Sequence, residues 1–191
     1  MEALKKYIKQ IHPISAETLE VLLAQFSTET FIKGTYFAKE GNNETRFGIL
    51  VKGVSRTFFR NNEGAEYNKM FNVAPSFIGA YSTLITGKEN RINIEFLTDA
   101  EVLVTNYQQF ISLYQKHPQI ESLSRKLSEN YFVQKEKREI ELVTMDVEKR
   151  YEIFKQEFPN LDQLIPQYHI ASYLGVSATQ LSRIRRNLAG K

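Results

Sequence analysis

The sequence predicts an α+β protein in which a β-rich unit, a long helix and a small helical domain follow one another. Three observations lead to this fold class. Between residues 30 and 106, short runs rich in β-branched and aromatic residues alternate with turn signals such as "EGNNE" and "NNEG". Residues 119–145 contain neither glycine nor proline and carry an apolar row at helical spacing. Residues 163–191 contain no acidic residue, and they carry two short apolar patterns separated by a glycine.

Composition restricts the classes of protein to which the chain can belong. The 191 residues are 42% hydrophobic, include no apolar run long enough to cross a bilayer, and begin without the apolar block of a secretory signal. A cytoplasmic protein without membrane contact is therefore expected. The chain has no cysteine, which excludes disulfides, thiolate metal sites and a cysteine nucleophile. We expect no catalytic residue, no metal and no cofactor.

The positive charge of the chain is concentrated at one end. The net charge is +3, but residues 163–191 hold four basic side chains, which leaves 21 of the 25 basic residues against all 22 acidic residues elsewhere. Such an asymmetry favours a polyanionic partner, and double-stranded DNA is the first candidate. The alternative is a solvated basic tail.

The β-rich unit is expected to extend over residues 1–118. Its first element is a helix in "ISAETLEVLLAQF", for which Ser15 is the predicted N-cap. Several short strands at nearly regular intervals then indicate a closed or double-sheet unit, in which "FFRNNEGAEY" is the clearest hairpin. A helix that begins near Tyr107 and stops at Pro118 ends the unit.

The segment 119–145 is predicted to form a long dimerisation helix. A helix of that length spans roughly 37 Å, which is more than a small domain needs, so a symmetric partner helix is expected. The alternative is a helix that packs only on its own β unit. The residues predicted to face a second copy are Ile120, Leu123, Leu127 and Tyr131.

The remaining residues, 146–191, are predicted to form a domain with a helix-turn-helix. Asp146 is the expected N-cap of a helix in "VEKRYEIFKQEF". "PQYHIASYLG" and "SATQLSRIRRNL" then give two short helices, in which Gly175 ends the first and Ser177 caps the second. If the apolar positions face inward, the second helix presents a polar and cationic face that suits a major groove. The predicted DNA-contacting residues are Ser177, Ala178, Thr179, Gln180, Ser182, Arg183 and Arg186.

The whole chain resembles the cyclic-AMP receptor protein and fumarate-nitrate regulator (Crp/Fnr) superfamily of transcription regulators. "KGTYFAKEGN", "FGILVKGVSRTFF" and "IASYLGVSATQLSRIRR" are similar to its first strands, its next hairpin and its helix-turn-helix. The resemblance implies a β-roll (double-stranded β-helix) of the cyclic-nucleotide-binding type, a dimerising helix and a DNA-binding domain. The family's wing hairpin is expected to be absent or reduced.

The segment "FIGAYSTLITGKENRINIEFLTDAEV" has the spacing of the family's phosphate-binding cassette. The resemblance implies seven ligand-binding candidates: Gly79, Ala80, Tyr81, Ser82, Thr83, Asn90 and Arg91. Where cyclic-AMP binders have glutamate and arginine, however, this chain has Ala80 and Asn90. Arg91 is one place further on and is expected on the opposite face of the chain. We therefore do not expect cyclic-AMP binding, because a buried phosphate needs a charged partner.

Two other classes of function were compared with a DNA-binding regulator. One is a small-molecule sensor whose pocket is retuned to another effector, which leaves the effector unknown. The other is an enzyme on a cupin-like barrel, which is disfavoured because no histidine falls in the β region. The three histidines are too scattered to suggest a haem or metal centre, and His169 is expected at the surface.

Overall fold

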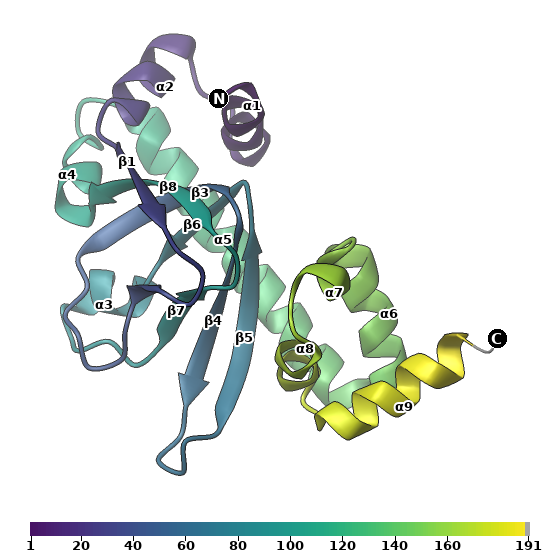
Figure 1. The fold of residues 1–191 in the computed structure, drawn as a ribbon. Helices are drawn as coiled ribbons and strands as arrows, with labels where there is room; N and C mark the ends of the chain where they lie inside the picture. The colour runs from purple at the N-terminus through teal and green to yellow at the C-terminus, as the bar shows by residue number, and fades with distance from the viewer. Residues whose placement is uncertain (190–191) are drawn as a thin grey trace. The chain divides into compact units, whose positions relative to one another are not determined.

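The computed structural model describes residues 1–189, which divide into two compact units (Figure 1). The first unit comprises Met1–Thr57 and Phe71–Phe132, and the second comprises Phe58–Met70 and the chain from Val133 onward. The boundary therefore falls inside the long helix, and the tip of one β hairpin belongs to the second unit. No helix in residues 1–189 has the length and hydropathy needed to cross a membrane.

The β-rich region forms two four-stranded sheets. The first has the order β1 (Ser27–Phe31), β8 (Ala100–Asn106), β3 (Arg46–Lys52) and β6 (Ser76–Gly79). The second has the order β2 (Tyr36–Ala38), β7 (Asn93–Phe96), β4 (Val54–Arg60) and β5 (Glu66–Val73). Strands that are distant in sequence are neighbours in both sheets, so the chain crosses repeatedly from one sheet to the other. This arrangement confirms the predicted double-sheet unit.

The central strands of the first sheet, β3 and β8, are buried on both faces. Successive residues of β3 point to opposite sides, because Leu50 belongs to the apolar cluster shared by the two sheets and Ile49 to the cluster under the helices. The same alternation in β8 places Val102 in the first cluster and Leu103 in the second. The long apolar runs of these strands follow from this double burial.

Four helical segments cover the outer face of that sheet. They are α1 (Glu2–Ile11), α2 (Ala16–Leu23), α4 (Tyr107–Ser112) and the first turns of α5 (Pro118–Thr144). As predicted, α2 starts at Ser15, whose Oγ accepts a hydrogen bond from the Thr18 amide at 3.1 Å. The sequence analysis did not predict α1, although its Leu4 and Ile8 are four residues apart and both are buried in the core.

The apolar row of α5 packs inside its own unit. Ile120 and Leu123 are 0% and 1% exposed in the core, Leu127 packs against the same cluster, and the Tyr131 hydroxyl donates to the Phe77 carbonyl oxygen at 2.9 Å. Burial raises the pKa of the Tyr131 hydroxyl. These side chains meet the sheet of their own chain, which was the alternative interpretation of the pattern. The assignment of the row to a partner helix stays a prediction.

A different set of apolar side chains on α5 is exposed. Val133, Ile140 and Val143 are 61%, 54% and 86% exposed, and their spacing of seven and three residues places them on one face of the helix. Phe132, directly before Val133, is also exposed. These four residues are called the exposed row of α5 below.

The second unit contains the last turns of α5 and four further helices. They are α6 (Val147–Glu157), α7 (Leu161–Leu164), α8 (Gln167–Leu174) and α9 (Ala178–Ala189). The Asp146 side chain caps α6 by accepting from the Lys149 amide at 2.8 Å, as predicted. Helix α7 was not among the predicted elements, and His169, which was expected at the surface, is 4% exposed. That placement was wrong because one side of α8 is covered, as described below.

Polar contacts join the last turns of α5 to the helices that follow. Lys137 Nζ lies 2.6 Å from Glu157 Oε1 on α6. The Arg138 guanidinium donates to the Tyr173 carbonyl oxygen and lies 4.0 Å from the centre of the Tyr173 ring on α8. The helix end is thus held by charged side chains as well as by apolar packing.

Replacing Leu123 tests whether this row belongs to the core. Leu123→Ala is expected to lower the free energy of unfolding by about 2–5 kcal/mol, because it leaves a cavity in a packed core. Urea unfolding at two protein concentrations measures this, and the loss should be the same at both. Ile32→Ala, at a side chain that is 72% exposed, is the control. A loss that depends on protein concentration would place Leu123 in a subunit interface instead.

Candidate nucleic-acid interface

The turn between α8 and α9 is fixed by one residue in the left-handed region. Gly175 has φ of 72°, which a residue with a side chain adopts only with strain. The following amide, that of Val176, returns a hydrogen bond to the Ala171 carbonyl oxygen at 3.0 Å. The first helix therefore ends as the sequence predicted, and α9 leaves at a defined angle.

Ser177 and Gln180 form a reciprocal cap at the start of α9. The Ser177 hydroxyl oxygen accepts from the Gln180 amide at 3.2 Å, and Gln180 Oε1 accepts from the Ser177 amide at 3.1 Å. The Ser177 hydroxyl and Gln180 Oε1 are also 3.2 Å apart. This is the capping-box arrangement, with glutamine at the third position. The side chains of both residues, which were predicted to contact DNA, fix the helix start.

The outer face of α9 consists of short or cationic side chains. Leu181 and Ile184 are 0% and 9% exposed against the rest of the domain. The opposite side of the helix is exposed and includes Ala178, Thr179, Ser182, Arg183 and Arg186. We call these five residues the reading face. It is narrow at its N-terminal end and basic towards its C-terminal end, which is the shape that enters a major groove.

Arg185 on the same helix is directed elsewhere. It interacts with the Tyr151 hydroxyl on α6, although burial is the main reason that the pKa of Tyr151 is raised. Arg185 is not among the predicted DNA contacts.

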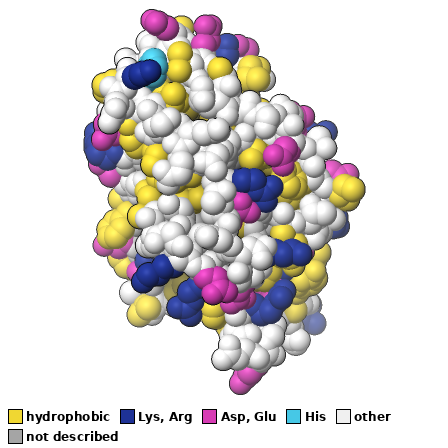
Figure 2. Space-filling view, turned by 90° about the vertical axis from the view of Figure 1, so that its left-hand side faces the viewer, with side chains coloured by type: hydrophobic (Ala, Val, Ile, Leu, Met, Phe, Trp, Pro, Cys, Tyr) yellow, Lys and Arg dark blue, Asp and Glu magenta, His cyan; other side chains and the backbone are white. Residues whose placement is uncertain are grey.

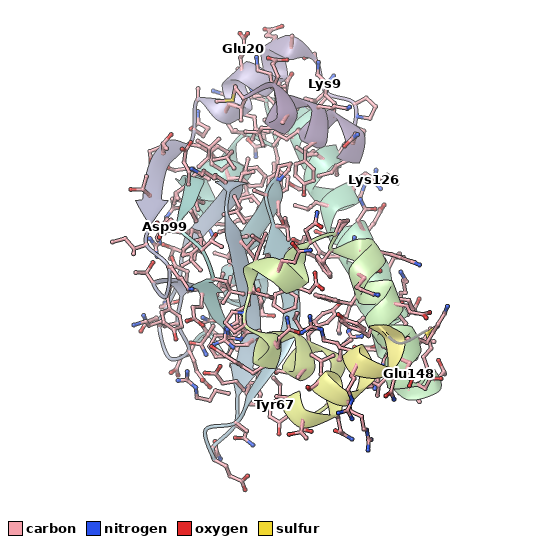
Figure 3. All side chains as sticks on the ribbon, turned by 45° about the vertical axis from the view of Figure 1, so that its right-hand side comes forward. Lys9, Glu20, Tyr67, Asp99, Lys126 and Glu148 are labelled. Carbon is pink, nitrogen blue, oxygen red and sulfur yellow. The ribbon has the colours of Figure 1, made fainter. Side chains whose placement is uncertain are left out.

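An open hollow lies beside the start of α9. It has a volume of about 460 Å³ and is lined by Asp146, Val147, Glu148, Val176, Gln180, Arg183 and Ile184. Two acidic residues, Asp146 and Glu148, thus line the same hollow as the basic Arg183 (Glu148 is labelled in Figure 3). Because α6 was predicted as a separate packing helix, the sequence analysis did not associate these acids with α9.

The seven candidates of the cassette differ in burial. Ala80 and Thr83 are buried, whereas Tyr81, Ser82 and Arg91 are exposed and Gly79 is half-buried. Ala80 belongs to the aromatic and aliphatic cluster between the two sheets. Helix α3 (Tyr81–Thr86) follows it, and the Tyr81 hydroxyl lies 3.0 Å from Ser128 Oγ on α5. None of the seven lines either of the two hollows described for residues 1–189.

Asn90 is used by its own loop. Its Nδ2 donates to the carbonyl oxygens of Lys39 and Ile92 at 2.9 and 2.6 Å, and its Oδ1 accepts from the Ile92 amide at 3.2 Å. The side chain is 2% exposed, so all this bonding is buried. Arg91, next to it, is exposed, and both residues lie in the loop before β7 and not in a strand. The position of the family's phosphate-binding arginine thus holds a residue that closes the loop.

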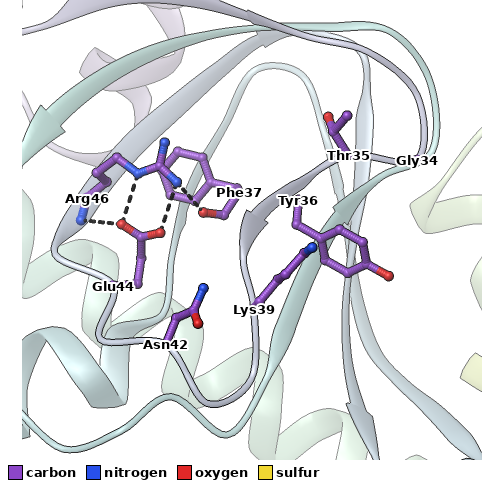
Figure 4. A pocket seen from close by; sticks show the side chains of 8 residues that line it. All are labelled: Gly34, Thr35, Tyr36, Phe37, Lys39, Asn42, Glu44 and Arg46. Carbon is purple, nitrogen blue, oxygen red and sulfur yellow. Dashed lines mark hydrogen bonds and ion pairs between the residues drawn. The ribbon is translucent and has the colours of Figure 1, made fainter.

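The other hollow lies in the first unit, along β2 and the loop that leads to β3 (Figure 4). Its volume is also about 460 Å³, and its lining includes Thr35, Tyr36, Lys39, Glu44 and Arg46. Arg46 donates to both oxygens of Glu44 at 2.9 Å and to the Phe37 carbonyl oxygen at 2.7 Å, and hydrogen bonding to Glu44 raises the pKa of the Arg46 guanidinium. Its cation is neutralised locally. Basic and acidic side chains are likewise interspersed on the face shown in Figure 2.

Comparison with solved structures identifies the architecture. The global regulator CLP of Xanthomonas campestris, described as c-di-GMP responsive, superposes with a TM-score of 0.72 at 15% identity over 92% of this chain and 92% of that one. FixK2 of Bradyrhizobium japonicum gives 0.76 at 16% identity, over 86% and 85% of the two chains. The Thermus thermophilus catabolite activator protein gives 0.59 at 19% identity, over 94% and 86%. The chain has the Crp/Fnr fold.

The Crp/Fnr fold is found without support from sequence comparison. No protein-family model and no curated protein matches the sequence. The α+β layout, with a double-sheet unit, a long helix and C-terminal helices, is confirmed. Within residues 1–189 no group of three or more His, Asp or Glu side chains could hold a metal ion.

The charge of Glu148, which lines the hollow at the start of α9, is expected to affect binding to DNA. Glu148→Gln is expected to strengthen binding to duplex DNA about two- to fivefold at low salt, because it removes a negative charge next to the basic side of α9. Fluorescence anisotropy across a salt series measures the effect, which should shrink as salt rises. Glu63→Gln, the same change at an exposed residue of the β4–β5 turn, is the control. Equal effects of both substitutions would rule out a local role for Glu148.

Proposed function

We propose that this protein is a sequence-specific DNA-binding transcription regulator of the Crp/Fnr type that acts as a homodimer in the cytoplasm. It is proposed to be a regulator rather than an enzyme. Helix α9 would enter the major groove with its reading face toward the base edges, and α8 would lie across it. The effector is left unassigned.

The observation that carries the proposal is the reading face itself. The left-handed backbone of Gly175 and the side chains of the Ser177–Gln180 cap fix the start of α9, and none of these groups belongs to the reading face. The exposed side then offers small Ala178 and Thr179 followed by Arg183 and Arg186. Small residues permit close approach, and a guanidinium can donate two parallel hydrogen bonds to guanine. A helix whose exposed side meets only water needs neither the small residues at its start nor the arginines further along.

The proposed subunit contact uses the exposed row of α5. Val133, Ile140 and Val143 form an apolar stripe on a helix that already buries a different row in its own unit. Two such helices side by side would remove these side chains from water. A two-fold dimer would present two α9 helices to half-sites about one helical turn, or roughly 34 Å, apart.

Cyclic-AMP sensing is not part of the proposal. Asn90 stands in place of the family's arginine and its polar atoms are bonded to the loop backbone, while Ala80 is packed in the core. The second candidate function, a small-molecule sensor retuned to another ligand, has less support for the same reason. Neither of the two hollows described for residues 1–189 is lined by a residue of the cassette.

Selection of bound sequences from random duplex DNA tests the proposal. The protein is expected to enrich a near-palindromic site, and its affinity should fall steeply as salt rises, because phosphate contacts release counterions. Arg183→Ala is then expected to weaken binding to that site by about 1–3 kcal/mol and to relax the preference at one base of each half-site. Lys6→Ala, which removes an exposed charge from α1, is the matched control. Enrichment of no palindrome would refute the proposal.

Disruption of the exposed row tests the subunit contact. The double variant Ile140→Glu with Val143→Glu is expected to be monomeric at micromolar concentration, because it places four carboxylates in an apolar interface. Sedimentation equilibrium measures the mass, and affinity for the palindrome should fall with it. Ile32→Glu, at an exposed isoleucine on another part of the chain, should leave the dimer intact. A double variant that remains dimeric would show that the contact lies elsewhere.

A further inference from the structure

The tip of the β4–β5 hairpin is hydrogen-bonded to the first helix of the helix-turn-helix. The Asn68 amide donates to Ser172 Oγ at 3.0 Å, and Asn68 Nδ2 donates to the His169 carbonyl oxygen at 2.8 Å. The Ser172 hydroxyl in turn donates to the Glu66 carbonyl oxygen at 2.7 Å. These bonds lie within the second unit and join residues more than 100 positions apart in the sequence.

The burial of these groups shows that the contact is closely packed. Asn68 is 7% exposed and His169 is 4% exposed. A buried amide side chain is costly unless its hydrogen-bonding groups are satisfied, and the carbonyl oxygen of His169 satisfies Nδ2. His169 and Ser172 are three residues apart, so both lie on the face of α8 that meets the hairpin. Tyr67, the neighbour of Asn68 on β5, is labelled in Figure 3.

A contact that fixes the position of α8 also fixes the position of α9, because the two helices are packed together. The two helices share a core in which Ile170, Leu174 and Leu181 are 0% exposed. Together with the Gly175 turn and the Ser177–Gln180 cap, this packing makes them one rigid pair. None of the three hydrogen bonds involves the reading face. The hairpin therefore contacts the DNA-binding helices without covering the groups that would meet the bases.

We propose that Asn68 and Ser172 are positioning residues for DNA recognition, through which the β4–β5 hairpin sets the placement of the helix-turn-helix. This inference rests on the proposed function. A dimer that reads two half-sites depends on the placement of both α9 helices, whereas a single half-site depends only on the reading face. The hairpin contact accordingly governs the affinity for the paired site and the tolerance of its spacing, and not the identity of the bases read.

The test uses the full chain and the palindrome enriched by the unaltered protein, together with a duplex that carries one half-site. Asn68→Asp keeps the shape of the side chain but removes the amide donor to the His169 carbonyl oxygen. It is expected to weaken binding to the palindrome roughly tenfold, to leave half-site binding within about twofold, and to reduce the discrimination against palindromes lengthened by one or two base pairs. Asn62→Ala, in the exposed turn of the same hairpin, should change none of these values.

A second variant keeps the test decisive if Asn68→Asp folds poorly. Ser172→Ala removes one acceptor and one donor and should act like Asn68→Asp, whereas Ser172→Thr retains the hydroxyl and should restore spacing discrimination. Hydrogen exchange provides a measurement without DNA, because the Asn68 amide should exchange faster in Ser172→Ala than in the unaltered protein.

Three results would overturn the inference. They are unchanged exchange of the Asn68 amide, unchanged spacing discrimination, and an equal loss of affinity for the palindrome and the half-site. The last of these would indicate general damage to the domain. Failure of the unaltered protein to enrich any palindrome would instead refute the proposed function, and the exchange measurement would still decide whether the contact forms.

Discussion

The architecture depends on the burial of the first turns of α5 against the sheet of its own unit. Ile120 and Leu123 complete the apolar cluster that also receives α1, α2 and α4, so the outer face of the first sheet is closed by this helix. A helix side chain cannot be buried in two places, and the core contact therefore determines which face of α5 remains available. As a result, apolar side chains are exposed only further along the helix, at the exposed row. Helix α5 is thus packed in the core at its first turns and carries an exposed apolar face near its end.

The second unit separates the task of shaping α9 from the task of contacting a partner. Backbone geometry at Gly175, the Ser177–Gln180 cap and the Leu181 contact determine where the helix begins and how it lies. Arg185 interacts with Tyr151 inside the domain. The side chains of the reading face, which remain exposed on α9, are short or cationic. The absence of acid from the last 29 residues matches this division, while the carboxylates of Asp146 and Glu148 come close to α9 from a preceding helix.

Much of this fold was predictable because its signals are local. Capping at Ser15 and Asp146, the hairpin turn and the Gly175 turn each depend on a few neighbouring residues, and each occurs as expected. The errors concern contacts between distant residues. The row of α5 was correctly identified as buried, but periodicity does not say whether a helix meets a sheet or a second helix. His169 was misplaced because the group that covers it comes from residues about 100 positions earlier.

The β4–β5 hairpin tip, which belongs to the second unit, is synthesised well before the helices with which it packs. Residues 58–70 leave the ribosome long before residues 166–174, with which their strand tip is eventually packed. During synthesis the Asn68 side chain must stay hydrated on an edge strand until α8 arrives. The asparagine is suited to this interval, because a polar side chain discourages the premature pairing that an apolar one at the same edge would invite. The same polar side chain thus suits both the buried contact with α8 and an edge strand that is exposed before α8 is made.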